Sequence, residues 1–282
     1  MDLEANRAAR ERSRAAWDTM AAGWEAERDA IWEDSRTVGE WLVDKLEPQP
    51  GDTVLELAAG VGDTGLLAAS RIGPDGRVLI TDFSTAMLDS ARRRAAELGI
   101  ANAEFRVLDA ENIDLATDSV DGVLCRWGYM LMIDPARAMA ESRRVLRPGG
   151  RLAFSVWAAP DANPWASLVS RILIAQGAMT PRAPDSPGIF AMDNPERVRS
   201  LVTGAGFAEP EIEAVPTRRR FPSFEAFWSY LTDLAGAISP VLRGLSPESQ
   251  RLVKAELEEM SRPFAQGNRY DFPALCLNAV TH

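Results

Sequence analysis

The sequence predicts an α/β protein whose mostly parallel sheet is covered by helices on both faces. Short apolar runs alternate with helical patterns over residues 53–157, and breaks rich in glycine and proline separate them. Strands that alternate with helices in this way form parallel sheets, because each crossover helix packs back onto the sheet. A glycine-rich turn, "GVGDTG", follows the first apolar run. Ligands of such sheets bind at the ends of the strands, so this turn is the first place to look for a site.

Helices are expected before the first strand. Residues 3–20 are rich in Ala, Arg and Glu, and a second helical pattern in "DSRTVGEWLVDKL" ends at "EPQPGD". Five strands should follow, at 53–57, 77–81 and 104–108, within "DSVDGVLCRW", and in "RLAFSVW". Among the intervening helices, "STAMLDSARRRAAELG" has Ser84 as its N-cap and Gly99 just past its end, and "RPGG" closes the helix before the fifth strand.

The pattern changes after residue 158. One helix is expected at 165–176, a Pro-rich loop at "TPRAPDSPGIF", and another helix at 195–203. Two more strands lie in "EPEIEAVPTRRRF" and "RYDFPALCLNAVTH", which brings the predicted sheet to seven strands. The predicted organisation is an N-terminal helical cap (1–47), an α/β core (48–158), a lid segment that returns to the sheet (159–222), a helical insertion (223–266) and a final strand (267–282).

Composition narrows the classes of function. The chain has 282 residues and a formal net charge of -10, so nucleic acids would be repelled on average and no nucleic-acid partner is expected. No stretch approaches the roughly 18 apolar residues of a membrane span, and the charged N-terminus does not resemble a signal peptide. The two cysteines, Cys125 and Cys276, lie in apolar runs and indicate a reducing compartment. We therefore expect a cytoplasmic protein.

The histidine count restricts the chemistry. The single histidine is His282, the last residue. Zinc sites built on histidine and a Ser-His-Asp triad are therefore disfavoured, and we expect no metal. A catalytic base, if the reaction needs one, would be a carboxylate, a tyrosine, a cysteine or water.

The residues that flank the glycine-rich turn indicate which ligand it binds. Gly60, Gly62 and Gly65 have the G-x-G-x-x-G spacing, which alone is weak evidence for a dinucleotide. Glu56 ends the preceding strand, where NAD-binding folds are apolar because a pyrophosphate lies beyond. An acid at this position instead suits a ligand that carries an ammonium group.

Two more acids follow successive strands. Asp82 ends the second strand and can accept the hydroxyl groups of a ribose, whether the ligand is NAD or another adenosine cofactor. Asp109 follows the third strand beside Ala110 and could accept an adenine amino group. Because the carboxyl ends of parallel strands meet at one edge, we expect Glu56, Asp82 and Asp109 to form one lip of the sheet.

The combined motifs resemble those of the class I S-adenosylmethionine-dependent methyltransferases. They are "VLELAAGVGDTG", "VLITDFSTAMLDSAR", "FRVLDAENIDLATDSVDGVLCRWGYMLM" and "RVLRPGGRLAFSVW", and the resemblance covers about residues 40–158. It is strongest to the ubiquinone/menaquinone-biosynthesis and small-molecule tailoring branch. It implies a Rossmann-like sheet with an antiparallel last strand, and S-adenosyl-L-methionine as cofactor with S-adenosyl-L-homocysteine as product. The sequence departs at Ala58, where this family usually has glycine.

The resemblance also implies roles for individual residues. Glu56 would face the methionine ammonium of the cofactor, Asp82 the ribose and Asp109 the adenine, and Trp24 is an early aromatic placed over the cofactor. The full set of implied cofactor-binding residues is Trp24, Glu56, Ala58, Gly60, Gly62, Asp82, Phe83, Met87, Asp109, Ala110, Arg126 and Trp127.

Methyl transfer from a sulfonium is an in-line displacement in which alignment and desolvation carry much of the barrier. Tyr129 and Asp134 are the nearest candidates for a base. We expect O- or C-methylation most, of a small aromatic or apolar acceptor such as a phenol or quinol, with a carboxylate or amine also open. Aromatic residues of the cap, lid and insertion are the candidate acceptor contacts, together with Tyr129: Trp17, Tyr129, Trp165, Phe190 and Trp228.

The sequence is also compatible with other roles for these residues and for the protein. The same aromatics would also serve to attach the lid to the sheet, or to form a homodimer interface through the helical insertion. The protein as a whole could be a regulatory protein that binds the cofactor without turnover, or an NAD(P)-dependent oxidoreductase.

Overall fold

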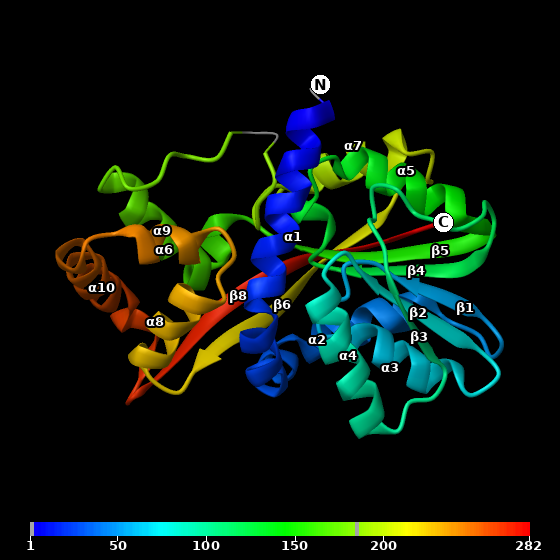
Figure 1. Cartoon of the computed structure of the whole chain (residues 1–282), viewed down its shortest axis with the longest axis horizontal. Coiled ribbons are helices and arrows are strands. Elements are labelled where there is room, and N and C mark those ends of the chain that lie inside the picture. Colours follow the sequence, from blue (N-terminus) through cyan, green and yellow to red (C-terminus); the bar gives the residue numbers. More distant parts are fainter. Residues whose placement is uncertain (1–2, 184–185) are drawn as a thin grey trace.

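The computed structural model describes residues 3–183 and 186–282 and is built around one twisted sheet (Figure 1). Its main path has the order β3-β2-β1-β4-β5-β8-β6. The strands are β1 (Thr53–Glu56), β2 (Arg77–Asp82), β3 (Ala103–Val107), β4 (Val120–Arg126), β5 (Leu146–Trp157), β6 (Glu211–Phe221) and β8 (Arg269–Thr281). The strands β1 to β5 pair in parallel, and β8 pairs antiparallel with β5 and β6. The predicted sheet is confirmed, antiparallel last strand included.

Helices cover both faces of the sheet. α2, α3 and α4 lie side by side against one face, and α5 and α7 lie against the other (Figure 1). The helices are α1 (Leu3–Ala26), α2 (Arg28–Leu46), α3 (Asp63–Ile72), α4 (Thr85–Leu98), α5 (Pro135–Val145), α6 (Pro164–Ala175), α7 (Pro195–Gly204), α8 (Phe224–Asp233), α9 (Ile238–Gly244) and α10 (Pro247–Ser261), with short 3-10 turns at Tyr129–Leu131, Pro160–Ala162 and Arg262–Phe264.

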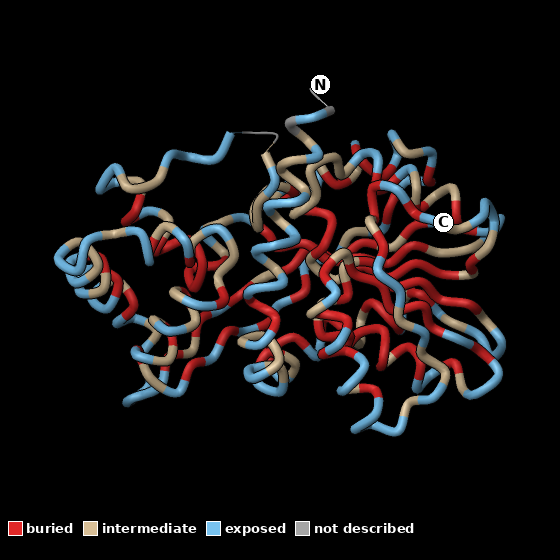
Figure 2. The backbone as a smooth tube through the Cα atoms, in the orientation of Figure 1, coloured by how far each residue is buried: buried red, intermediate tan, exposed pale blue. Residues whose placement is uncertain are grey.

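The hydrophobic core follows the central strands, where the backbone is buried almost continuously (Figure 2). Val123, Leu124 and Cys125 of β4 are each 0% exposed, as expected for a central strand that is covered on both faces. The predicted ends of α4 are also confirmed. The Ser84 hydroxyl accepts a hydrogen bond from the Met87 backbone N–H, and Gly99 adopts the left-handed conformation at φ 67°.

The strands β6 and β8 extend beyond the rest of the sheet, and a group of helices packs around this extension. β8 pairs with β6 over residues 270–280 but with β5 only over 276–281, so a two-stranded ribbon projects past β5. α6, α8, α9 and α10 gather around this ribbon, away from the α/β core (Figure 1). Most of the predicted helical insertion is thus α8, α9 and α10, but its end contains the short strand β7 (Ala265–Gln266), which pairs with β8.

Local differences from the sequence expectations have backbone causes. The predicted turn at "RPGG" lies within β5, because Leu146 already pairs with Val120 and the strand passes a bulge before Arg151 pairs with Gly122. Two residues of the Pro-rich loop, Pro184 and Asp185, lie outside the described residues. Among the described helices, none combines the length and the apolar character needed to cross a bilayer.

Candidate active site

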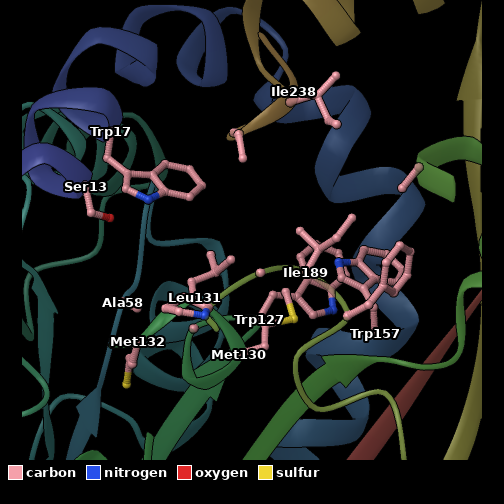
Figure 3. A pocket seen from close by; sticks show the side chains of 18 of the residues that line it. Ser13, Trp17, Ala58, Trp127, Met130, Leu131, Met132, Trp157, Ile189 and Ile238 are labelled. Atoms are coloured by element: carbon pink, nitrogen blue, oxygen red, sulfur yellow. The ribbon is translucent and has the colours of Figure 1, made fainter. Parts of the chain in front are cut away.

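One large cavity, of about 700 Å³, opens at the carboxyl edge of the sheet. The loops that follow β1, β2, β3 and β4 line one end, which we call the cofactor end. α6, β6, the loops around α8 and α9, and the segment 187–190 line the other, which we call the acceptor end. Figure 3 shows Ser13 and Trp17 of α1 on one side of the cavity and Trp127 and Trp157 on the other. Carboxyl edges are where open α/β sheets bind their ligands.

The glycine loop after β1 is held in a tight, partly left-handed conformation. Ala58 has φ 50° and Gly60 has φ 57°. A Cβ built on Gly128 would lie 2.7 Å from the Cβ of Ala58, so Gly128 leaves room for the extra methyl group that Ala58 introduces. Ala58 and Gly60 both line the cavity. Gly62 does not: a Cβ there would lie 2.8 Å from the Cβ of Ala91, so this glycine allows the loop to pack closely on α4.

Asp82 lines the cavity at the end of β2 and also holds the glycine loop. One carboxylate oxygen accepts a hydrogen bond from the Gly60 N–H at 2.9 Å, and the other accepts one from the Ser84 N–H at 2.8 Å. Burial raises the pKa of Asp82 to about 6. Phe83 and Met87 line the cavity next to it. Each carboxylate oxygen has a second lone pair, so Asp82 can still accept hydrogen bonds from a ligand.

Asp109 and Ala110 line the cavity after β3, together with Glu111, a residue that sequence reasoning missed. Asp109 accepts a hydrogen bond from the Glu111 N–H at 2.9 Å. The Glu111 carboxylate accepts one from the Ile133 N–H at 2.8 Å and forms an ion pair with Arg10 of α1, whose Nε lies 3.7 Å from the carboxylate of Asp109. Arg10 was also missed, and its pairing with Glu111 attaches α1 to the loop after β3.

α1 covers the cofactor end. Trp17 and Trp24 line the cavity, with ring centroids 5.9 Å apart. Asp18 accepts a hydrogen bond from the Ser84 hydroxyl at 2.6 Å, which fixes this part of α1 over the start of α4. The indole N–H of Trp24 is buried and has no hydrogen-bond partner among the described residues. A ligand acceptor atom in the cavity would provide that partner.

Glu56 does not line the cavity, although the sequence suggested that it faces the ligand. It is 2% exposed and lies behind the glycine loop, where a Cβ on Gly65 would come 2.2 Å from its Oε2. Burial raises the pKa of Glu56 to about 8, and the charge of Arg126 offsets this only in part. Any effect of Glu56 on a ligand therefore passes through the loop or through Arg126.

Arg126 and Trp127 lie where the two ends of the cavity meet. Arg126 donates a hydrogen bond to the Ser35 hydroxyl at 2.6 Å, and its guanidinium lies 4.7 Å from the ring centroid of Trp127. Trp127 has φ 61°, stacks on Trp157 with centroids 4.3 Å apart, and donates its indole N–H to the Cys276 sulfur at 3.3 Å. A left-handed backbone is unusual for a bulky residue, so surrounding contacts must hold this ring in place.

Aromatic rings continue from Trp157 into the acceptor end. Trp165 lies 5.0 Å from Trp157 and 6.2 Å from Tyr230, measured between ring centroids. Phe190 also lines this end. Trp228 does not; Lys254 of α10 lies 5.8 Å from the centroid of its ring.

The two candidate bases are not placed to act. Tyr129 is 0% exposed, its hydroxyl is hydrogen-bonded to Ser142 at 2.6 Å, and burial raises its pKa well above the usual value. Asp134 caps α5 by accepting a hydrogen bond from the Arg137 N–H at 3.0 Å. Neither residue lines the cavity. We therefore withdraw both as candidate bases, and Tyr129 as an acceptor contact.

The cofactor end fits an adenosine cofactor with an amino-acid tail. It offers Asp82 and Asp109 at adjacent strand ends, the unpartnered indole N–H of Trp24, and the Arg126 guanidinium beyond the glycine loop. This edge, on a sheet of the order found here, is the arrangement that the resemblance to the class I S-adenosylmethionine-dependent methyltransferases implies. Among the described residues, no cluster of histidine, cysteine and carboxylate side chains is placed to hold a metal ion.

Comparisons with known proteins agree with this class. Residues 54–150 match a methyltransferase-domain family. The chain is 39% identical over 106 residues to an arsenite methyltransferase of Halobacterium salinarum, covering 38% of this chain and 27% of that protein. It is 42% identical over 111 residues to the ubiquinone/menaquinone biosynthesis C-methyltransferase UbiE of Acidiphilium cryptum, covering 39% and 44%. The chain thus spans less than half the length of these two relatives.

The fold is shared with solved structures. One of them is a phosphoethanolamine N-methyltransferase of Haemonchus contortus in complex with S-adenosylhomocysteine, with a TM-score of 0.61, 16% identity, and coverage of 95% of this chain and 60% of that one. At this identity the likeness concerns the fold alone. Together with the family match, it confirms the resemblance found in the sequence. Residues 54–150 therefore form a methyltransferase domain, with the cavity that the resemblance to the class I S-adenosylmethionine-dependent methyltransferases implies.

Proposed function

We propose that the protein transfers the methyl group of S-adenosyl-L-methionine to a small acceptor with an aromatic or apolar body, by O- or C-methylation. The observation that carries the proposal is the continuity of the cavity. The cofactor end and an aromatic acceptor end share one space of about 700 Å³. Trp127 lies at their junction, so an acceptor stacked in the aromatic end would meet the cofactor without leaving the cavity.

The chain's own contribution is binding, orientation and exclusion of water. When bound, the cofactor supplies a methyl group that its sulfonium already activates. Asp82 and Asp109 are the acceptors for polar groups of the cofactor, and α1 covers them from above. The stacked rings of Trp127 and Trp157 restrict how a flat acceptor can lie. Alignment of this kind lowers the barrier of the displacement itself, so a base is needed only for an acceptor that must lose a proton.

Tyr129 and Asp134 do not line the cavity, so another residue would have to act as a base. Besides Asp82, Asp109 and Glu111, the carboxylate of Asp193 also lines the cavity. Burial raises the pKa of Asp193, with Arg182 opposing that change. A residue of this kind would assist only an acceptor that must lose a proton. Acceptors with an acidic hydroxyl or an activated carbon need less help, and they are the ones we favour.

Two measurements test this function. Calorimetric titration should show that S-adenosylhomocysteine binds and that NAD does not. Incubation with S-adenosylmethionine labelled in its methyl group, over a panel of phenols and quinols, should then give a labelled product. Binding without any labelled product would favour the regulatory alternative. Binding of NAD without binding of S-adenosylhomocysteine would favour the oxidoreductase.

A further inference from the structure

An arginine occupies a core-facing position on β6. Side chains alternate along this strand, and the buried row contains Val215, Thr217, Arg219 and Phe221. Arg219 is only 5% exposed, and it lines the acceptor end of the cavity. Its neighbour Arg218 is exposed on the other side of the strand and pairs with Asp271 at 2.8 Å. An apolar residue would be expected where Arg219 stands, because buried guanidinium groups are costly.

Aromatic rings surround the Arg219 guanidinium. It lies 4.9 Å from the ring centroid of Tyr230, 5.3 Å from that of Trp165 and 5.7 Å from that of Phe221. These rings attract the cation but cannot accept its hydrogen bonds in the way that an oxygen does. The Nε–H of Arg219 is buried, and no described residue accepts its hydrogen bond.

The carboxylate that pairs with Arg219 is already used by another residue. Asp34 lies 3.9 Å from the Arg219 Nη1, which is beyond hydrogen-bond distance. Its Oδ2 accepts a hydrogen bond from the Arg220 backbone N–H at 2.8 Å, and its Oδ1 accepts one from the Arg220 Nε at 2.7 Å. Asp34 therefore offers Arg219 charge compensation at a distance and no direct hydrogen bond.

A second buried guanidinium adds to the positive charge of this region. Arg126 also lines the cavity. Burial lowers the pKa of Arg126, and so does the charge of Arg219, while Asp63 and Glu56 oppose this. The acids that compensate Arg126 lie on the side of the glycine loop, away from β6. An anion in the acceptor end would thus compensate a charge that the protein itself compensates only in part.

We propose that Arg219 binds a carboxylate group of an aromatic acceptor. The proposal rests on the function proposed above and narrows its substrate class. A planar guanidinium can donate two parallel hydrogen bonds to a carboxylate, and the group is already desolvated in its aromatic surroundings. The ring of Trp165 lies beside it, the ring of Trp157 lies 5.0 Å further on, and the two rings suit the flat body of the same molecule. Arg219 would orient the acceptor, and the atom methylated would lie elsewhere on it.

Matched acid and amide pairs test the proposal. The protein, saturated with S-adenosylhomocysteine, is titrated by calorimetry with 2-naphthoate against 2-naphthamide, and with indole-3-acetate against indole-3-acetamide. The members of each pair are alike in shape and differ in charge. Wild-type protein should bind the acid of at least one pair roughly tenfold to a hundredfold more tightly than its amide.

Substitutions assign this preference to the side chain. Arg219→Met should abolish the preference, Arg219→Lys should retain part of it, and the control Arg218→Met should leave it unchanged. Titration of Arg219→Lys with S-adenosylhomocysteine reports folding even if the Met variant does not fold. Wild-type protein that binds S-adenosylhomocysteine but prefers no acid would overturn the role of Arg219, and so would a preference that survives in Arg219→Met. Failure of S-adenosylhomocysteine itself to bind would instead overturn the proposed function.

Discussion

Replacing Asp82 by alanine should separate its role in the loop from its role in cofactor binding. The carboxylate accepts hydrogen bonds from the Gly60 N–H at 2.9 Å and the Ser84 N–H at 2.8 Å, and it lines the cofactor end of the cavity. Asp82→Ala leaves both N–H groups without their acceptor, at a cost of about 1–3 kcal/mol each. It also removes a buried charge.

The removed charge offsets much of this loss at neutral pH. Burial raises the pKa of Asp82 from 3.8 to about 6, so the folded protein holds a proton that the unfolded chain releases between these values. The stability that Asp82 contributes is therefore full below about pH 4 and falls as the pH rises through 6. The fall amounts to about 3 kcal/mol at 1.36 kcal/mol per unit. At pH 8 we expect Asp82→Ala to lose at most about 3 kcal/mol, and at pH 4 to lose more.

Asp82→Ala should also weaken cofactor binding, and this loss is separate from the change in stability. Loss of charge-assisted hydrogen bonds to the ribose should weaken binding of S-adenosylhomocysteine by about 1.5–3 kcal/mol, or roughly tenfold to 150-fold. Calorimetry at pH 8 measures this, and urea denaturation at pH 4 and pH 8 measures stability. Asp89→Ala serves as control, because Asp89 pairs with Arg92 on α4 and does not line the cavity. A folded Asp82→Ala protein with wild-type affinity would refute the reasoning.

Three further outcomes follow from the site. Phe190→Ala should raise the acceptor KM or lower kcat, with a loss in kcat/KM equivalent to about 1–2 kcal/mol of apolar contact. The affinity for S-adenosylhomocysteine, measured by calorimetry, should stay within twofold of wild type. Lost cofactor binding would contradict the assignment of Phe190 to the acceptor end. Ala58→Gly should raise the urea-derived stability by up to about 1 kcal/mol, because glycine relieves the left-handed backbone; a clear loss would show that the methyl group packs favourably. Glu56 has a pKa of about 8 in the folded protein, so the free energy of unfolding of the wild type should fall from pH 4.5 to 8 by up to about 1.4 kcal/mol per pH unit. Glu56→Gln should make this dependence on pH less steep. Equal slopes for the two proteins would mean that folding does not raise the pKa of Glu56.

The sequence predicted the sheet and the edge that lines the cavity because both depend on local patterns. Apolar runs of strand length and the helix caps define the elements, and parallel strands bring Asp82 and Asp109 to one cavity. Glu56 shows the limit of this reasoning. Its spacing places it at the end of β1, but spacing does not say on which side of the glycine loop the side chain lies. Gly65 leaves the space behind the loop that receives it.

The missed residues depend on contacts between distant segments. Arg10 lies on α1 and meets Glu111 only because α1 folds back over the loop after β3. Nothing in the composition of residues 3–20 predicts that crossing. The position of Arg219, in contrast, could have been predicted from the alternation of residues along its strand. Its alternation with Thr217 and Phe221 on β6 places it on the buried face.

The cofactor and acceptor ends are linked in this fold, because α1 lines the cofactor end and also approaches Leu234 next to α8. On the cofactor side, Arg10 pairs with Glu111 and Asp18 accepts a hydrogen bond from Ser84. Further along the helix, a Cβ on Gly23 would lie 2.3 Å from a terminal methyl group of Leu234, in the helices around the ribbon. A displacement of α1 on cofactor binding would therefore shift the wall around Leu234, which itself lines the cavity. The polar contacts that hold α1, which include the ion pair of Glu25 with Arg93, lie outside the central sheet, so such a displacement would leave the buried ladder of strands intact.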